Sequence, residues 1–503
     1  MSNDDSKRVF VSYVREDSDA VDDLCAVLEA AKIPYWRDRN DLGPGDAWRA
    51  KIREAIRSGS MVFLACFSDK SRAKDKSYMN EELTLAVDEF RQMPPGRTWL
   101  IPTRFDGGDL PYWDLGAGRS LDDLNYVDLF GKAHAAAAAK LVTTIHGLMG
   151  DRQMSPAAAL EAVERANAGS RVDLLKQLTK DMLVDPAKRI QLDDLVSQEV
   201  QRILAAINDD DRVAGPVSGT NEERIVKYAT AAQEMWDLAK PFCASLQVAA
   251  RYGTPDVLAP WVTGIRSLVQ APLKVRSGDS TLLDLGLLPG MVAIMTAGMA
   301  GVSARRYDNV KALVADPMVR SKYDSKPLPI LMAVDPFSPF DSQQWTANTL
   351  ARGTIEGKPF AEALSDMTEN RVGKYRTPIG EWLHMSLRPL FADQWPDADA
   401  FALEFDRAEV FLGILGQDAV NARTAANPDA PGWGRSHWFG RSAWRAGHGH
   451  GNPVEDLQYE LGTEGDRWGP LRADLFGGDA ERASAAVERY KGDFDKMAGR
   501  HAF

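Results

Sequence analysis

The first third of the chain alternates short apolar runs with amphipathic segments. Five runs rich in β-branched and aromatic residues predict strands. Between most of them, apolar residues recur at spacings of three and four, which predicts helices. Strands that alternate with helices indicate a parallel sheet covered on both faces. The predicted strands are residues 8–13, 33–37, 61–67, 99–105 and 124–129.

Four helices are expected between and after these strands. Asp17 or Ser18 is expected to cap the first helix, and Asp46 the second, because short polar side chains satisfy free amides at helix starts. The third helix contains Glu82, and the fourth covers 133–149. Residues 7–149 are therefore expected to form an α/β domain with a five-stranded parallel sheet.

Beyond residue 150 the pattern becomes almost wholly helical. Residues 150–208 predict a helical connector, and the polar, breaker-rich residues 209–220 predict a linker. Residues 221–503 predict a mostly helical sensor or assembly domain, in which 327–335 is expected to form one or two buried strands. The helices expected after residue 150 are 157–168, 172–183, 192–207, 222–252, 257–269, 303–314, 359–367, 380–387 and 481–497.

One stretch of this C-terminal region, residues 427–469, differs in composition from its surroundings. It combines glycines with Trp433, Trp438, Arg441 and Trp444. An ordered loop over the core, a partner or ligand surface, and a surface that stacks on bases all fit this composition. Tryptophan and arginine are favoured anchors at interfaces, so we expect these four residues on a partner or ligand surface.

Composition narrows the class of protein. The 503 residues carry a net charge of −12, which argues against a broad nucleic-acid or anionic-membrane surface. The three cysteines are scattered and no signal peptide is evident, so we expect a cytoplasmic protein. The most apolar stretch, residues 287–299, is interrupted by proline and glycine and is expected to be a buried helix rather than a membrane span.

Few other motifs suggest chemistry. His448 and His450 flank a glycine, but no further ligands stand at a recognisable spacing, so no metal site is predicted. No phosphate-binding loop or dinucleotide fingerprint is present. The pair Arg305-Arg306 is expected to be solvated.

The strongest candidate is Glu82, in the stretch 76–83. This stretch follows a predicted buried strand and opens a helix. Ligands of open α/β sheets bind at the carboxyl ends of the strands, where such a helix begins. The alternative is an ordinary first-turn acid, favoured by the helix dipole by ~0.3–1 kcal/mol.

Six short segments in order and spacing resemble the TIR domain, in the form common in bacterial proteins. They are Phe10-Val11-Ser12-Tyr13 followed by Asp17, residues 33–38, the loop 43–48, Phe67-Ser68, Ser77-Tyr78 followed by Glu82, and residues 101–104. The resemblance covers residues 7 to about 149 and implies a flavodoxin-like fold. Many catalytic members carry a tryptophan where this chain has Tyr78.

The resemblance implies cleavage of the bond between nicotinamide and ribose in NAD⁺, which is a substrate, so no cofactor is expected. Glu82 is the implied catalytic residue. The residues implied to bind NAD⁺ are Ser12, Tyr13, Arg15, Arg37, Asp38, Trp48 and Tyr78.

Three functions remain open at this stage. The first is an NAD⁺ glycohydrolase of bacterial, antiphage defence, activated by assembly through its C-terminal domain. The second is a cyclase that makes a cyclic ADP-ribose signal, and the third is a non-catalytic scaffold. The implied partners are other TIR domains and an unknown activating protein or small molecule at the C-terminal domain.

Overall fold

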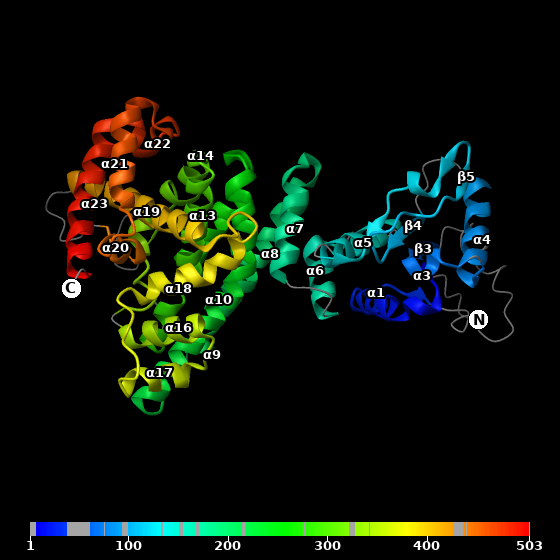
Figure 1. Ribbon diagram of the computed structural model, residues 1–503, viewed down its shortest axis with the longest axis horizontal. Helices are drawn as coiled ribbons and strands as arrows, with labels where there is room; N and C mark the ends of the chain where they lie inside the picture. The colour runs from blue at the N-terminus through cyan, green and yellow to red at the C-terminus, as the bar shows by residue number, and fades with distance from the viewer. Residues whose placement is uncertain are drawn as a thin grey trace. The chain divides into compact units, whose positions relative to one another are not determined.

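The chain folds into two compact units, Met1–Leu178 and Thr179–Phe503, and the boundary falls within helix α7 (Arg171–Leu183) (Figure 1). The computed structural model describes residues 7–37, 61–74, 76–92, 99–131, 134–149, 154–166, 171–213, 217–274, 277–320, 327–341, 343–426, 436–438 and 440–501.

The N-terminal unit is built on a five-stranded parallel sheet of order β2-β1-β3-β4-β7. The predicted α/β fold is thereby confirmed. The strands are β1 (Arg8–Ser12), β2 (Tyr35–Trp36), β3 (Met61–Phe67), β4 (Leu100–Arg104) and β7 (Val127–Asp128). The larger helices are α1 (Ser18–Ala30), α4 (Tyr78–Gln92), α5 (His134–Met149) and α6 (Pro156–Arg165).

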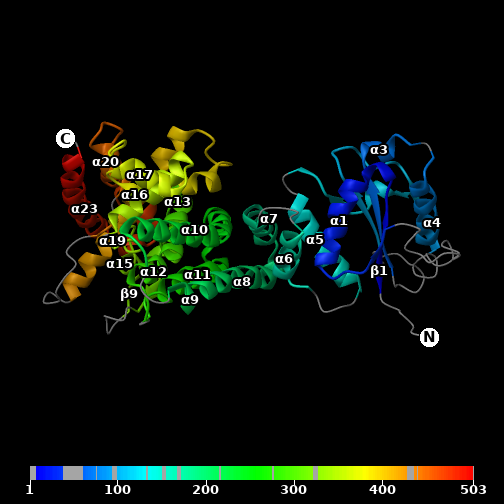
Figure 2. The same ribbon diagram turned by 90° about the horizontal axis from the view of Figure 1, so that it is seen from below.

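Strand β3 lies at the centre of the sheet, and all seven of its residues are buried. Helix α4 covers one face of the sheet, and α1 and α5 lie over the other (Figure 2). Because alternate residues of a strand point to opposite faces, a strand between two layers must be apolar throughout. This explains why β3 is a continuous apolar run.

Three local details differ from the sequence prediction. The expected loop after β4 contains a small antiparallel hairpin, β5 (Asp114–Gly116) with β6 (Arg119–Ser120). A short helix, α3 (Asp69–Arg72), precedes α4. The side chain of Asp17 does not cap α1, since its carboxylate accepts a hydrogen bond from Ser68 instead. The expected helix that begins at Asp46 lies outside the described residues.

The C-terminal unit is mostly helical, as predicted. Its helices of ten or more described residues are α8 (Arg189–Ile207), α10 (Asn221–Tyr252), α11 (Ala259–Gln270), α13 (Leu288–Ser303), α16 (Gln344–Glu356), α18 (Pro378–Leu387), α19 (Ala398–Ala426), α21 (Pro453–Glu464) and α23 (Ala480–His501). Shorter ones include α14 (Tyr307–Val310), α15 (Ile330–Ala333), α17 (Phe360–Thr368), α20 (Arg441–Ala446) and α22 (Gly469–Arg472). Helix α13 lies against both α10 and α19 (Figure 1).

Helix α13 is the expected buried helix. Among the described residues, one stretch, Ser280–Ser303, is long and apolar enough to cross a membrane by length and composition. Its apolar window is entirely buried inside the C-terminal unit, as in the core helix of a globular domain. The apolar composition of this stretch follows from its burial, because a helix that is packed on all sides needs apolar residues on every face.

The segment 327–335 departs from the expected buried strands. Only Leu328–Pro329 forms a strand, β9, and it pairs with β8 (Met318–Val319). The next four residues form α15, which packs against α19. A short apolar run fits a buried helical turn as well as a strand, so the tertiary contact decides.

The expected surface role of the tryptophan and arginine segment is wrong for Trp438 and Arg441. The Trp438 side chain is fully buried, and its Nε1 donates a hydrogen bond to the carbonyl oxygen of Leu331, 3.2 Å away. Trp444 is half-buried and stacks on His448, and Trp433 lies outside the described residues. The physical reason is that an indole can anchor a core when its N–H finds an acceptor.

Arg441 is buried because it neutralises carboxylates between helices. Its Nη1 donates to Asp406 of α19 (3.0 Å) and its Nε to Glu381 of α18 (3.2 Å), while Arg445 donates to the other Asp406 oxygen (2.7 Å). A neighbouring acid, Glu409, accepts hydrogen bonds from the amide and the hydroxyl group of Ser442, and burial raises its pKa to about 7. This network joins α18, α19 and α20, and a buried charge requires such partners.

The approach of α13 to α19 gives a stability prediction. A Cβ atom at Gly298 would lie 2.7 Å from Cδ1 of the buried Leu412. Gly298→Ala should therefore lower the free energy of unfolding by about 1–3 kcal/mol through overpacking. Urea unfolding followed by far-ultraviolet circular dichroism measures the change.

The matched control is Gly492→Ala in α23, where a Cβ atom meets nothing within 4 Å. Alanine there should raise stability by roughly 0.5–1 kcal/mol, because glycine is unfavourable within a helix. Equal effects of the two substitutions would contradict the close packing of α13 on α19.

Candidate functional site

The most direct contact at the carboxyl edge of the sheet joins two of the predicted site residues. Ser12 is the last residue of β1 and is fully buried. Its Oγ donates a hydrogen bond to Oε2 of Glu82, 2.7 Å away. Glu82 is 8% exposed, so the carboxylate sits at the boundary between the core and solvent. A hydrogen bond to a charged group is stronger than a neutral one and fixes its orientation.

The position of Glu82 on α4 follows from the helical repeat. The apolar face of α4 includes Met79, Leu83 and Ala86, which pack into the same core as Phe10 of β1. Glu82 lies at the edge of this face, next to the end of β1. The adjacent Glu81 is exposed, because successive residues of a helix are turned by about 100°.

Tyr78 precedes Glu82 by one helical turn and is 69% exposed. Its side chain therefore does not pack into the core beside β3. Residues four apart lie on the same helix face, so an exposed aromatic ring and a partly accessible carboxylate share the first turns of α4.

A second pair of predicted site residues lies on the side of α1. Arg37 donates from Nε to Tyr13 Oη (3.2 Å) and its guanidinium lies over the Tyr13 ring. The same guanidinium donates to the backbone oxygen of Ser18 and pairs with Asp22, both in α1. The structure thus separates the predicted residues into two groups, since Ser12 and Glu82 lie on the side of α4.

The remaining predicted residues are placed as follows. Arg15 lies in the exposed turn after β1. In the described part of the chain, the guanidinium group of Arg15 makes no hydrogen bond or ion pair. Asp38 and Trp48 lie outside the described residues.

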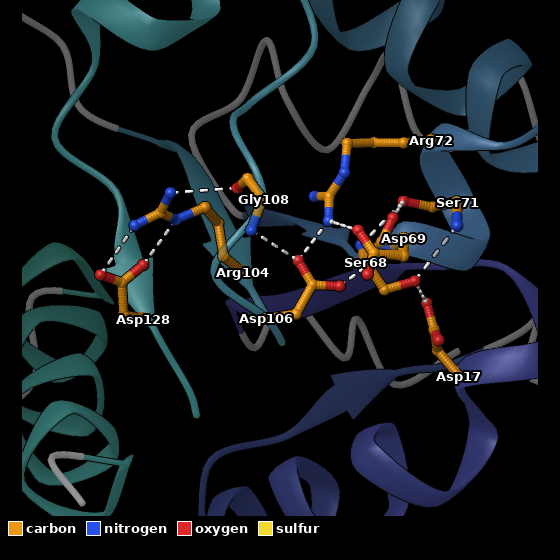
Figure 3. A network of polar contacts seen from close by, with 9 residues as sticks. All are labelled: Asp17, Ser68, Asp69, Ser71, Arg72, Arg104, Asp106, Gly108 and Asp128. Carbon is orange, nitrogen blue, oxygen red and sulfur yellow. Dashed lines mark hydrogen bonds and ion pairs between the residues drawn. The ribbon is translucent and has the colours of Figure 1, made fainter. Parts of the chain in front are cut away.

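A polar network at the ends of β3, β4 and β7 was missed by the sequence analysis (Figure 3). Ser68, directly after β3, donates to the buried carboxylate of Asp17 and accepts from the amide of Ser71. Asp106, after β4, accepts hydrogen bonds from Arg72 and from the backbone amide of Asp69. Residues that follow β1, β3 and β4 are thereby connected at one edge.

Arg104 holds the outer end of this network. It forms a bidentate pair with Asp128 of β7, with N–O distances of 2.6 and 2.9 Å, and donates to the carbonyl oxygen of Gly108. Burial opposes ionisation of Asp106, but hydrogen bonds from Arg72 and two backbone amides hold its pKa below the usual range. The signal in the sequence is that Ser68 and Asp106 directly follow predicted strands, although pattern alone does not say which residues pair.

The described residues contain no group of three or more His, Cys, Asp or Glu side chains that can hold a metal ion. The arrangement at the carboxyl edge instead offers one oriented carboxylate, an exposed aromatic ring and an exposed arginine. Such a set can stabilise a developing positive charge and hold an anionic group.

Comparison with known families agrees with this geometry. Residues 9–142 match the family model described as the TIR domain. No curated protein and no solved structure matches the chain. The matched range contains the parallel sheet, apart from Arg8 at the start of β1, and both pairs, Ser12–Glu82 and Tyr13–Arg37. The chain therefore contains a TIR domain, at residues 9–142, and a C-terminal region that the match does not cover.

Proposed function

We propose that this protein is an NAD⁺ glycohydrolase that releases nicotinamide. A TIR domain supports NAD⁺ cleavage, cyclisation or scaffolding. The observation that favours cleavage is the buried hydrogen bond from Ser12 to Glu82, which orients a carboxylate at the ligand-binding edge of the sheet. An ordinary first-turn acid would be expected to be solvated rather than held against the end of a neighbouring strand.

One carboxylate is enough for this reaction on chemical grounds. Nicotinamide in NAD⁺ already carries a positive charge and leaves as a neutral base, so no general acid is required. The ribose then develops oxocarbenium character. In the proposed role, Glu82 stabilises this cation and orients its hydroxyl groups or the attacking water.

Other residues are proposed to hold the substrate. Tyr78 lines the nicotinamide side, because its exposed ring lies one turn from Glu82 on the same helix face. Arg15 and the backbone amides at the end of β1 hold the diphosphate, since arginine suits phosphate oxygens. Arg37 and Tyr13, which are hydrogen-bonded to each other, are proposed to contribute to substrate binding together. Asp38 and Trp48 remain proposed contributors from the loop after β2.

Cyclisation is the second candidate. Hydrolysis and cyclisation pass through the same ribosyl cation and differ in the nucleophile that captures it, so the same carboxylate serves both. Product analysis distinguishes them, because hydrolysis yields ADP-ribose and cyclisation yields its cyclic form.

The C-terminal unit is proposed to control activity by controlling the association of TIR domains, which commonly self-associate. This large helical unit lies outside the TIR match and carries none of the catalytic motifs sought in the sequence. In the proposed setting the protein acts in the cytoplasm in defence against phage, where loss of NAD⁺ stops growth.

Substitution of Glu82 tests the proposed catalytic role. Glu82→Gln keeps the shape of the side chain and removes its charge, so NAD⁺ cleavage should fall by ~10²–10³-fold, as for loss of one preorganised electrostatic group. Nicotinamide release by the purified protein measures this. Glu81→Ala is the control and should be nearly silent, because Glu81 is exposed. Wild-type turnover of Glu82→Gln in an active sample would favour the scaffold.

Substitution of Ser12 tests the orientation of Glu82. Ser12→Ala removes the donor to Oε2 of Glu82 and should lower kcat by about tenfold or more, the worth of one hydrogen bond to a charged group. KM should change little if Ser12 only positions Glu82. Ser12→Thr keeps the hydroxyl and should retain more activity than Ser12→Ala. The reverse order of the two variants would contradict a role for the hydroxyl.

Activation by assembly predicts a dependence on protein concentration. Turnover per chain should rise with concentration, and static light scattering on the same samples should show the mean mass rising over the same range. The reason is that association supplies contacts between TIR domains that a single chain lacks. Full activity in a species that remains monomeric would rule out this mode of control.

A further inference from the structure

A hollow of about 670 Å³ lies in the C-terminal unit, among α14, α21 and α22. Helices α14 and α22 contact each other at this place (Figure 1). Its volume is within the range of small-molecule sites. The hollow belongs to the region that the TIR match does not cover.

Three arginines from three separate segments line the hollow: Arg305 before α14, Arg467 after α21 and Arg472 at the end of α22. All three are exposed. Within the described part of the chain, none of their guanidinium groups makes a hydrogen bond or an ion pair. Most other arginines of this unit are paired, as Arg441 is, so three unpaired ones around one hollow form a distinct feature.

The carboxylates of the hollow do not cancel this charge. Asp308 is bound by Arg306, with N–O distances of 3.0 and 3.2 Å. Glu460 is bound by Arg407 through two bonds of 2.7 and 2.8 Å. The exposed Glu464 is the one lining carboxylate without a partner among the described residues. Three unpaired arginines therefore face one unpaired carboxylate, in a chain whose net charge is −12.

The backbone at Arg305 adds an independent observation. Helix α13 ends with the amide of Arg306 donating to the carbonyl oxygen of Gly301 (2.8 Å) and that of Arg305 donating to Val302 (3.0 Å). This pattern places Arg305 in the left-handed region, with φ of 53°. Glycine is the usual residue there, because a side chain is strained in this region. The fold thus carries strain at a residue whose side chain lines the hollow, as is common at functional sites.

The bottom of the hollow is rigid and aromatic. Tyr307 and Trp468 line it and are almost fully buried. Each packs against Phe411, with ring centroids 5.6 and 6.3 Å apart. Trp468 Nε1 also approaches Glu460 Oε2 at 3.5 Å. A packed floor of this kind keeps the arginine-bearing segments in fixed relative positions.

We propose that this hollow is a binding site for a small molecule that carries phosphate groups. The guanidinium group matches phosphate oxygens through two parallel hydrogen bonds. Three such groups around a small-molecule hollow suit a ligand with more than one phosphate. This site goes beyond the proposed NAD⁺ cleavage, and its test measures binding, so neither proposal depends on the other.

Isothermal titration of the full-length protein tests the site, with tripolyphosphate and ATP as probes and no divalent metal present. Both probes should bind, and more weakly at higher salt. Arg305→Gly and Arg472→Ala should each weaken binding about ten- to a hundredfold, the range for hydrogen bonds to charged groups. Glu464→Gln should tighten binding, because it removes the one unpaired carboxylate.

Arg305→Gly also separates binding from folding. Glycine suits the left-handed backbone at this position, so the variant should melt at the same temperature as the wild type or higher. The matched control is Arg376→Ala, since Arg376 is exposed and does not line the hollow. Its affinity for both probes should be unchanged.

The two probes distinguish the source of the phosphate. Tighter binding of ATP than of tripolyphosphate would assign a nucleotide, with the base against the aromatic floor, and equal affinities would assign the phosphate chain alone. The proposal is overturned if neither probe binds, or if Arg305→Gly binds them as the wild type does.

Discussion

The polar contacts of the N-terminal unit depend on the carboxyl edge of its five-stranded parallel sheet. The strands of this sheet all point the same way, so the polar residues that follow them meet at one edge, where the backbone leaves the sheet. Polar groups there are only partly accessible to water and need partners. Ser12 and Glu82 satisfy each other across 70 residues of sequence, and Arg104 and Asp128 do the same at the outer strands. The candidate site is one part of this edge.

The carboxylates at this edge accept hydrogen bonds from two kinds of donor, arginine side chains and a serine hydroxyl group. Asp106 and Asp128 each have an arginine as partner, and such pairs fix the loops that follow β4 and β7. Glu82 accepts from a neutral hydroxyl group, so its negative charge has not been cancelled by Ser12. The hydrogen bond from Ser12 fixes the direction in which this carboxylate points.

The C-terminal unit follows the same rule in an all-helical setting. The carboxylates inside it, such as Asp406, are matched by arginines from a neighbouring helix. Removing one partner would leave an uncompensated buried charge, which is strongly destabilising. Arginines with partners therefore hold this unit together, whereas the guanidinium groups of Arg305, Arg467 and Arg472 at the hollow have no hydrogen-bond or ion-pair partner among the described residues. Whether an arginine is paired depends on its contacts in the folded structure and does not follow from the residue type.

Much of the fold follows from the sequence, since periodicity reports burial directly. The five strands, the apolar run of β3 and the buried helix α13 were all predicted because a segment between two layers must be apolar on every side. Glu82 was chosen as a candidate because its stretch, residues 76–83, opens a predicted helix after a buried strand. The segments 327–335 and 427–469 were interpreted less well, because short apolar runs and tryptophan-rich stretches are compatible with several environments.

The pattern along the chain was enough to predict the five strands of the parallel sheet and most of the long helices. Only the packing of distant segments brings Ser12 to Glu82, places Tyr13 and Arg37 on the side of α1, and buries Arg441 among carboxylates. The physical reason is that the pattern along a chain reflects the average environment of each residue. A hydrogen bond or an ion pair depends instead on which distant segments pack together, and on distances of a few ångströms that no local pattern records.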